Sequence, residues 1–278
     1  MANEVVKAEG KKNIVGFLTS EVAKKSIEDV VGKKDSQRFV SALVSAVQTN
    51  PTLSECTNNS LLNAALIGHS LNLPQSPQLS YFYLVPFNNS KKGVKEATFQ
   101  LGYRGYIQLA MRSGQYQKIN ACDIREGELK SYNPITDEYV FEPELDYVKR
   151  GSLKVVGYYG YFILNNGFKK EIYWDKDRME AHAKRYSASY RKGWDSFWKS
   201  DFDEMARKTI IRQLISKWGI MSVDLEKAYE SDMAVIRDDG SNDYIDNVPD
   251  EPTEFKDVLE EGSVTEITEE VKDETDGE

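Results

Sequence analysis

An Asn-Gly turn between two strand-like runs is the feature that most restricts how this chain can fold. VVGYYGYFIL (155–164) and GFKKEIYW (167–174) are rich in aromatic and β-branched residues, and they lie on either side of Asn165-Asn166-Gly167. Asn-Gly between two such runs is the strongest short-range signal for a β-hairpin. Because a hairpin pairs its two strands antiparallel, the fold must include an antiparallel sheet.

Other runs of the same composition extend this sheet. YFYLVPF (81–87) and ATFQLGY (97–103) predict a second hairpin, with Lys92 and Lys95 in its connection. YQKINACDI (116–124) predicts one more strand, and we expect a small hairpin around Asn133-Pro134.

Helical periodicity appears before and after these strands. SQRFVSALVSAVQTN (36–50) repeats its apolar residues at helical spacing, and helices are also predicted over 61–71, 175–190 and 200–218. Hairpins and helices in this order predict an α+β fold, an antiparallel sheet of hairpins with helices packed on one side.

Charge divides the chain into unlike parts. Residues 231–278 hold 18 of the 45 acidic residues and three of the 36 basic ones, so their formal net charge is −15 and that of residues 1–230 is +6. We expect a helical or mobile N-terminal arm over 1–35, a basic core over 36–230 and a disordered acidic tail over 231–278. This asymmetry is typical of a nucleic-acid-binding body. The tail is expected to compete with DNA for the basic surface, to dock a partner protein, or only to keep the protein soluble.

Several classes of protein do not fit this sequence. No stretch approaches the roughly 18 to 20 consecutive apolar residues of a membrane span, so we expect a cytoplasmic protein with no membrane partner. Cys56 and Cys122 are widely separated, which predicts reduced thiols and neither disulfide nor zinc site. There is no G-x-x-x-x-G-K-[ST] motif, which disfavours a P-loop recombinase motor of the usual kind.

The segment FQLGYRGYIQLAMRSGQY (99–116) carries the most information about a binding site. As a helix it has a packing face of Tyr103, Ile107, Ala110 and Met111. Its other face presents Arg104, Gln108 and Arg112 at four-residue steps. Gly102 and Gly105 would let the backbone approach a phosphate at the helix start. Periodicity alone leaves open whether these arginines bind phosphate or are merely solvated.

A second helix, SDFDEMARKTIIRQLISKWG (200–219), is expected to begin at Ser200. Lys208 and Arg212 stack one turn apart along the edge of its apolar arc, which also takes in Trp218. Arg207 falls near the middle of that arc, where it either reaches out to solvent, which we favour, or binds a phosphate.

Aromatic and basic residues alternate in RYSASYRKGWDSFWKS (185–200), which includes Arg191 and Lys192. A single-strand binder needs such a pattern because every base offers a face for stacking and every nucleotide a phosphate. An aromatic core patch beside a solvated face has the same pattern.

Three blocks of this sequence resemble the characteristic blocks of phage and prophage RecT recombinases. They are FQLGYRGYIQLAMRSGQY, GYYGYFILNNGFKKEIYW and WKSDFDEMARKTIIRQLISKWG, and the resemblance covers about 36–229. It implies a fold like that of the annealing proteins that form rings in eukaryotes. It also implies a bacterial host cell, with the protein encoded by a phage or prophage.

The resemblance further implies a function in homologous recombination. A RecT-like protein binds single-stranded DNA and the annealed duplex, and pairs complementary strands without ATP or covalent catalysis. It works as a homo-oligomer, a ring or a helical filament, in which the N-terminal arm is expected to contact neighbouring subunits. A partner exonuclease and the host single-strand-binding protein are its expected partners.

Residues from both helices and from two hairpins are expected to line one DNA-binding trough. The M-x-x-K-T-x-x-R block carries over Lys208 and Arg212, and the L-G-Y-x-G-Y block carries over Tyr103, Arg104 and Gln108. Family members vary at Arg207. The full set of expected DNA contacts is Lys92, Lys95, Gln100, Tyr103, Arg104, Gln108, Arg112, Lys169, Arg191, Lys192, Arg207, Lys208 and Arg212.

Two other functions remain open from the residues alone. A passive single-strand nucleic-acid-binding protein would share the basic and aromatic pattern but would not anneal strands. A metal-dependent nuclease would have to use Asp201, Asp203 and Glu204, whose spacing fits helix capping better than a shared ion.

Overall fold

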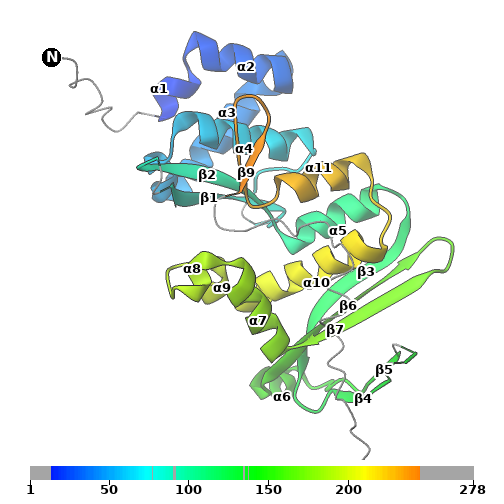
Figure 1. Ribbon diagram of the computed structural model, residues 1–278. Helices are drawn as coiled ribbons and strands as arrows, with labels where there is room; N and C mark the ends of the chain where they lie inside the picture. Colours follow the sequence, from blue (N-terminus) through cyan, green and yellow to red (C-terminus); the bar gives the residue numbers. More distant parts are fainter. Residues whose placement is uncertain (1–13, 77, 90–91, 134, 137, 245–278) are drawn as a thin grey trace, which may run out of the picture. The chain divides into compact units, whose positions relative to one another are not determined.

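The computed structural model describes residues 14–76, 78–89, 92–133, 135–136 and 138–244 (Figure 1). Its helices are α1 (Ile14–Leu18), α2 (Glu21–Val31), α3 (Lys33–Thr49), the 3-10 helix η1 (Pro51–Glu55), α4 (Asn58–Ser70), α5 (Tyr103–Arg112), α6 (Tyr147–Ser152), α7 (Lys176–Tyr186), α8 (Ala188–Arg191), α9 (Phe197–Ser200), α10 (Phe202–Trp218) and α11 (Val223–Ser231). Its strands are β1 (Phe82–Asn89), β2 (Val94–Leu101), β3 (Tyr116–Arg125), β4 (Leu129–Asn133), β5 (Glu138–Phe141), β6 (Val155–Leu164), β7 (Lys169–Asp175), β8 (Ala234–Ile236) and β9 (Asn242–Tyr244). None of the helices within these ranges combines the length and apolarity that a membrane crossing needs.

The α+β class is confirmed, but the strands form three antiparallel sheets where the sequence predicts one. Their strand orders are β1-β2-β8-β9, β3-β6-β7 and β4-β5. The hairpin at Asn165-Asn166-Gly167 joins β6 to β7, and Gly167 has the positive φ of 86° that this turn requires. The hairpin predicted around Asn133 is β4-β5, which pairs apart from the other strands.

Of the N-terminal helices, α4 packs on the sheet of β1 and β2, and α2 and α1 pack on other helices (Figure 1). Helix α4 lies against both strands, and α2 contacts α3 and α4. Leu18 of α1 and Ile27 of α2 are fully buried. Residues 14–35 are therefore mainly helical, and their buried side chains belong to the common core cluster.

Helix α10 is covered on several sides because it packs against α5, β3, β6 and β7. Gly160 of β6 allows this close approach, since a Cβ there would lie 2.4 Å from Cγ2 of Ile210. Ile210, Ile211, Leu214 and Ile215 are buried as predicted, whereas Trp218 is exposed. Ser200 does not begin this helix: it ends α9, and Asp201 occupies the N-cap of α10.

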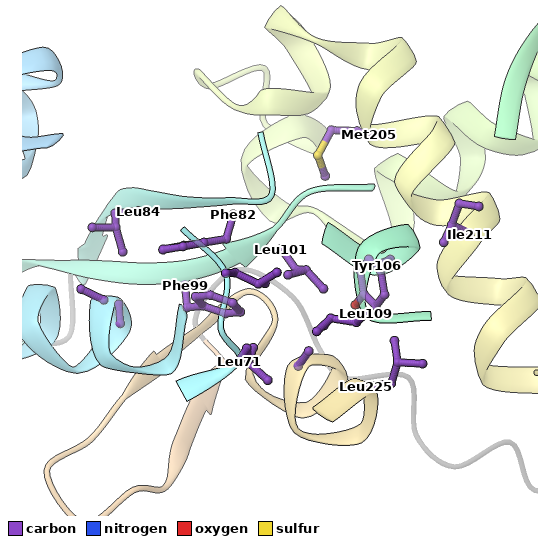
Figure 2. Packing of buried hydrophobic residues seen from close by; sticks show 14 of the residues in the cluster. Leu71, Phe82, Leu84, Phe99, Leu101, Tyr106, Leu109, Met205, Ile211 and Leu225 are labelled. Atoms are coloured by element: carbon purple, nitrogen blue, oxygen red, sulfur yellow. The ribbon is translucent and has the colours of Figure 1, made fainter. Parts of the chain in front are cut away.

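The packing face of α5 differs from the predicted one. Tyr106, Leu109 and Ala110 are buried in the common core, whereas Met111 is exposed. Figure 2 shows Tyr106 and Leu109 among buried residues of β1, β2 and α11. The prediction placed Tyr103 in the core, so the predicted packing face is rotated around the helix axis relative to the observed one.

The chain remains folded beyond residue 231, where the tail was expected to begin. The apolar run 233–236 contains β8, which pairs antiparallel with β2. Val235 of this strand is fully buried. These apolar residues lie within an acidic stretch, so composition concealed the strand. The remaining tail, 245–278, lies outside the described residues. A truncation that tests the tail must therefore cut after Tyr244.

Asp232 anchors this C-terminal segment. Its carboxylate accepts hydrogen bonds from Lys208 Nζ of α10 at 2.8 Å, from Leu101 N at 2.9 Å and from the Tyr106 hydroxyl at 3.0 Å. Both partners of the ion pair are buried, since Asp232 is 1% exposed and Lys208 is 4% exposed. One carboxylate therefore ties β8 to α10, β2 and α5.

We predict that Asp232→Ala strongly destabilises the protein. The substitution leaves the Lys208 ammonium buried without its counter-charge, a loss of about 3 to 5 kcal/mol in the free energy of unfolding. Urea denaturation measures this free energy. Glu230→Ala, which removes an exposed acid two positions away, should change it by less than about 0.5 kcal/mol. Equal effects of the two substitutions would contradict a structural role for the ion pair.

Candidate nucleic-acid interface

Tyr103 and Arg104 stand at the start of α5. The Arg104 side chain is exposed, and its Nε donates a hydrogen bond to the Tyr103 hydroxyl at 3.3 Å. This bond raises the pKa of Arg104. Among the described residues, no carboxylate forms an ion pair with Arg104. Its guanidinium therefore keeps a full positive charge toward solvent.

Arg207 of α10 shares the same tyrosine. Its guanidinium carbon lies 6.0 Å from the Tyr103 ring centre, and that of Arg104 lies 5.8 Å away. Arg207 also pairs with Asp123 at 3.0 Å and with Glu204 at 2.6 Å. It is thus neither a snorkelling residue nor a free phosphate ligand, because two carboxylates already neutralise it.

The glycines near α5 serve packing within the chain. A Cβ on Gly102 would lie 2.3 Å from the backbone oxygen of Ser80, and one on Gly105 would lie 2.2 Å from that of Tyr81. These glycines therefore leave room for the backbone of Ser80 and Tyr81, which leads into β1. The prediction that they leave room for a phosphate is wrong.

Lys208 does not reach the surface, so its predicted role as a DNA contact is wrong. Burial lowers the pKa of its ammonium group, and the ion pair with Asp232 opposes that shift. Helical periodicity predicts that Lys208 lies at an exposed edge of α10. In the structure the residue is only 4% exposed, because neighbouring elements cover the helix there.

Arg112 and Arg212 face other parts of the molecule. Arg112 donates to the backbone oxygens of Leu71 and Asn72 at 2.9 Å each, so it holds the chain that follows α4. The guanidinium carbon of Arg212 lies 4.2 Å from the ring centre of Tyr229 in α11. The expectation that Arg104, Arg112, Lys208 and Arg212 line one continuous trough is therefore wrong.

The other predicted contacts lie on several elements. Gln108 accepts a hydrogen bond from the Tyr81 hydroxyl at 3.4 Å, and Gln100 lines a cavity together with Tyr103. The remaining cations each have a neighbour of their own: Lys92 lies 3.8 Å from Glu96, Lys95 2.5 Å from Glu55, Lys169 2.8 Å from Glu171, Arg191 3.3 Å from the Lys184 backbone oxygen, and Lys192 4.6 Å from the Trp194 ring centre.

Most aromatic residues of 185–200 pack against one another. The His182 ring lies 4.5 Å from that of Tyr186 and 6.3 Å from that of Trp198, between ring centres. Trp198 in turn packs on Tyr190 and Phe202. The core interpretation therefore holds for these rings, whereas Trp194 and Phe197 remain exposed.

The three carboxylates of the nuclease alternative have separate partners. Asp203 accepts from the Tyr158 hydroxyl at 2.6 Å, Asp201 from Ser200 at 2.6 Å, and Glu204 pairs with Arg207. Over the described ranges there is no group of three or more His, Cys, Asp or Glu residues that could hold a metal ion.

Comparison with known proteins identifies the family. The RecT family profile matches residues 37–246, which include every element from α4 to β9. The chain belongs to the RecT family. It is 41% identical to the uncharacterized protein YqaK of Bacillus subtilis over 83% of this chain and 74% of that one. It is 26% identical to protein RecT of Escherichia coli over 79% of this chain and 80% of that one.

Membership in the RecT family assigns this protein a general function in DNA recombination by single-strand annealing. RecT-family annealing proteins are generally not catalytic enzymes. Asp232, the partner of a predicted site residue, is not among the residues predicted from the sequence. Its place directly before the apolar run 233–236 marks the start of a strand but does not indicate its partner.

We predict that His182 of this RecT-family protein stays neutral well below neutral pH. Burial, followed by the nearby Arg212, Arg185 and Arg178, lowers its pKa from 6.5 to about 4. The folded state therefore binds fewer protons than the unfolded state between these values, and stability decreases as the pH falls through this window, by at most about 3 kcal/mol. An NMR titration measures the pKa, with His69→Gln to assign the signals; a midpoint near 6.5 would contradict the packing.

Proposed function

We propose that this protein binds single-stranded DNA through its phosphates and anneals complementary strands without ATP or covalent chemistry. The observation that carries the proposal is the RecT match over 37–246, which spans nearly all of the described fold. The exposed Arg104 at the start of α5 supports it, because a phosphate contact needs a cation that is open to solvent.

Annealing of this kind depends on positioning. Neutralised phosphates allow two like-charged strands to approach, and bases held out of their own folds stay available for a complement. Stacking of the new base pairs supplies about 1.4 kcal/mol per step, so nucleotide hydrolysis is unnecessary. Exposed cations on Lys92, Lys169, Arg191 and Lys192 would extend the contact beyond Arg104, because their side chains can leave the local partners to meet a strand.

The proposed working form is a homo-oligomer, a ring or a helical filament, because one subunit can hold only a few nucleotides. The N-terminal helices offer a place for a subunit contact, because Val22 and Val30 of α2 are exposed apolar side chains that a neighbouring subunit would cover. A partner exonuclease would supply the single strands, and the host single-strand-binding protein would be its competitor on DNA. This activity would take place in the cytoplasm of a bacterial cell.

We predict that the protein accelerates pairing of complementary oligonucleotides in the absence of any nucleotide. Fluorescence from labels on the two strands measures the pairing rate, and parallel reactions with and without magnesium establish metal dependence. The strands should remain at full length. Coating of the strands without faster pairing would leave a passive binding protein, and shortened strands would indicate a nuclease.

We predict that Arg104→Ala weakens binding of single strands of every sequence to a similar extent. Loss of one phosphate contact should reduce the slope of log K against log salt concentration by about 0.7. Affinities for several oligonucleotides over a range of salt concentrations measure this slope. Arg38→Ala, which removes an exposed arginine of α3, provides the matched control. A loss confined to particular sequences would contradict recognition of the backbone.

A further inference from the structure

A small cavity opens between the start of α5 and the start of α10. Its lining combines aromatic, apolar and polar side chains: Tyr83, Gln100, Leu101, Gly102, Tyr103, Phe197, Asp201, Glu204, Met205 and Lys208. Its volume is about 130 Å³. Pockets that hold whole small molecules usually measure about 300 to 1,000 Å³, so this one suits a single planar ring.

The aromatic walls are available to a ligand. Tyr83 of β1 is 37% exposed and Phe197 of α9 is 36% exposed. Their ring centres lie 6.0 Å apart, and the rings are tilted by 40°. A planar base could stack on either ring.

A second cavity, of about 90 Å³, also has Phe197 in its lining. Gln100, Phe197 and Met205 line both cavities. Phe197 therefore borders two hollows.

The polar groups of the first cavity match the edge of a nucleobase. Glu204 and Asp201 offer carboxylate acceptors, and the Gln100 side-chain amide offers both a donor and an acceptor. Every base presents both donors and acceptors at its edge, so such a mixed set suits bases in general.

Positive charge lies beside this cavity. Tyr103 forms one wall, and its hydroxyl accepts the hydrogen bond from the exposed Arg104. A base stacked in the cavity would keep its own phosphate within reach of that guanidinium.

We propose that this cavity receives one base of the bound single strand in each subunit, with Phe197 and Tyr83 as the stacking surfaces. The inference rests on the proposed function and adds to it a contact with bases. Two of the three blocks that resemble RecT proteins, 99–116 and 198–219, meet at this cavity although they are distant in the sequence. One captured base per subunit would set the register of the strand and leave the other bases free to pair.

The test separates bases from phosphates. Affinity is measured for a thymidine oligonucleotide and for an abasic oligonucleotide of the same length and charge. The wild-type protein should prefer the strand that carries bases. Phe197→Leu and Tyr83→Leu, which remove rings on two different elements, should each reduce that preference by at least about fivefold and leave abasic binding unchanged.

Tyr147→Leu provides the matched control, because Tyr147 is a 90% exposed ring that lines neither cavity. Unchanged abasic binding shows that a variant is folded. If one of the two variants unfolds, the other variant still tests the proposal. Equal wild-type affinity for both strands, or a preference that survives both substitutions, would overturn the base site and leave the proposed function intact. Failure to bind either strand would overturn both.

Discussion

The buried ion pair between Lys208 and Asp232 is the interaction on which the rest of this structure depends. A charged pair without water is stable only when its remaining donors and acceptors are satisfied. Here Asp232 meets that condition by accepting from Leu101 N and the Tyr106 hydroxyl as well. The chain beyond α11 is thereby held against β2, which keeps α5 in a fixed position. The exposed end of α5, where Tyr103 and Arg104 stand, is positioned by this carboxylate.

The covering of α10 decides which cations remain available for DNA. Because strands and helices surround it, Lys208 pairs internally, while Arg207 is held by Asp123 and Glu204. Burial favours the neutral acid at Asp123, yet the hydrogen bond from Arg207 lowers its pKa. Internal ion pairs thus neutralise much of the positive charge that composition assigns to the core. The positive charge that stays exposed lies at the start of α5 and on lysines and arginines of other elements.

Two of the blocks that resemble RecT proteins come together where α5 and α10 begin. Gln100 and Tyr103 come from one block, and Met205 and Lys208 come from another, yet all four line one cavity. Close packing of β1 against Gly102 and Gly105 brings Tyr83 to the same place. A surface assembled in this way can combine an exposed guanidinium with stacking rings, which are the two kinds of contact that single-strand binding uses.

The sequence by itself determined the α+β class, the hairpin at Asn165-Asn166-Gly167, the positions of the main helices and the family. Each of these depends on local turn chemistry, on apolar periodicity or on motifs that are contiguous in the chain. Only the tertiary structure decided that Lys208 is buried, that Arg112 holds backbone oxygens and that residues 231–244 are folded. Periodicity shows which side of a helix is apolar but not how many neighbours cover it. The partner of Lys208 lies in an acidic segment 24 residues away, and no local pattern connects the two.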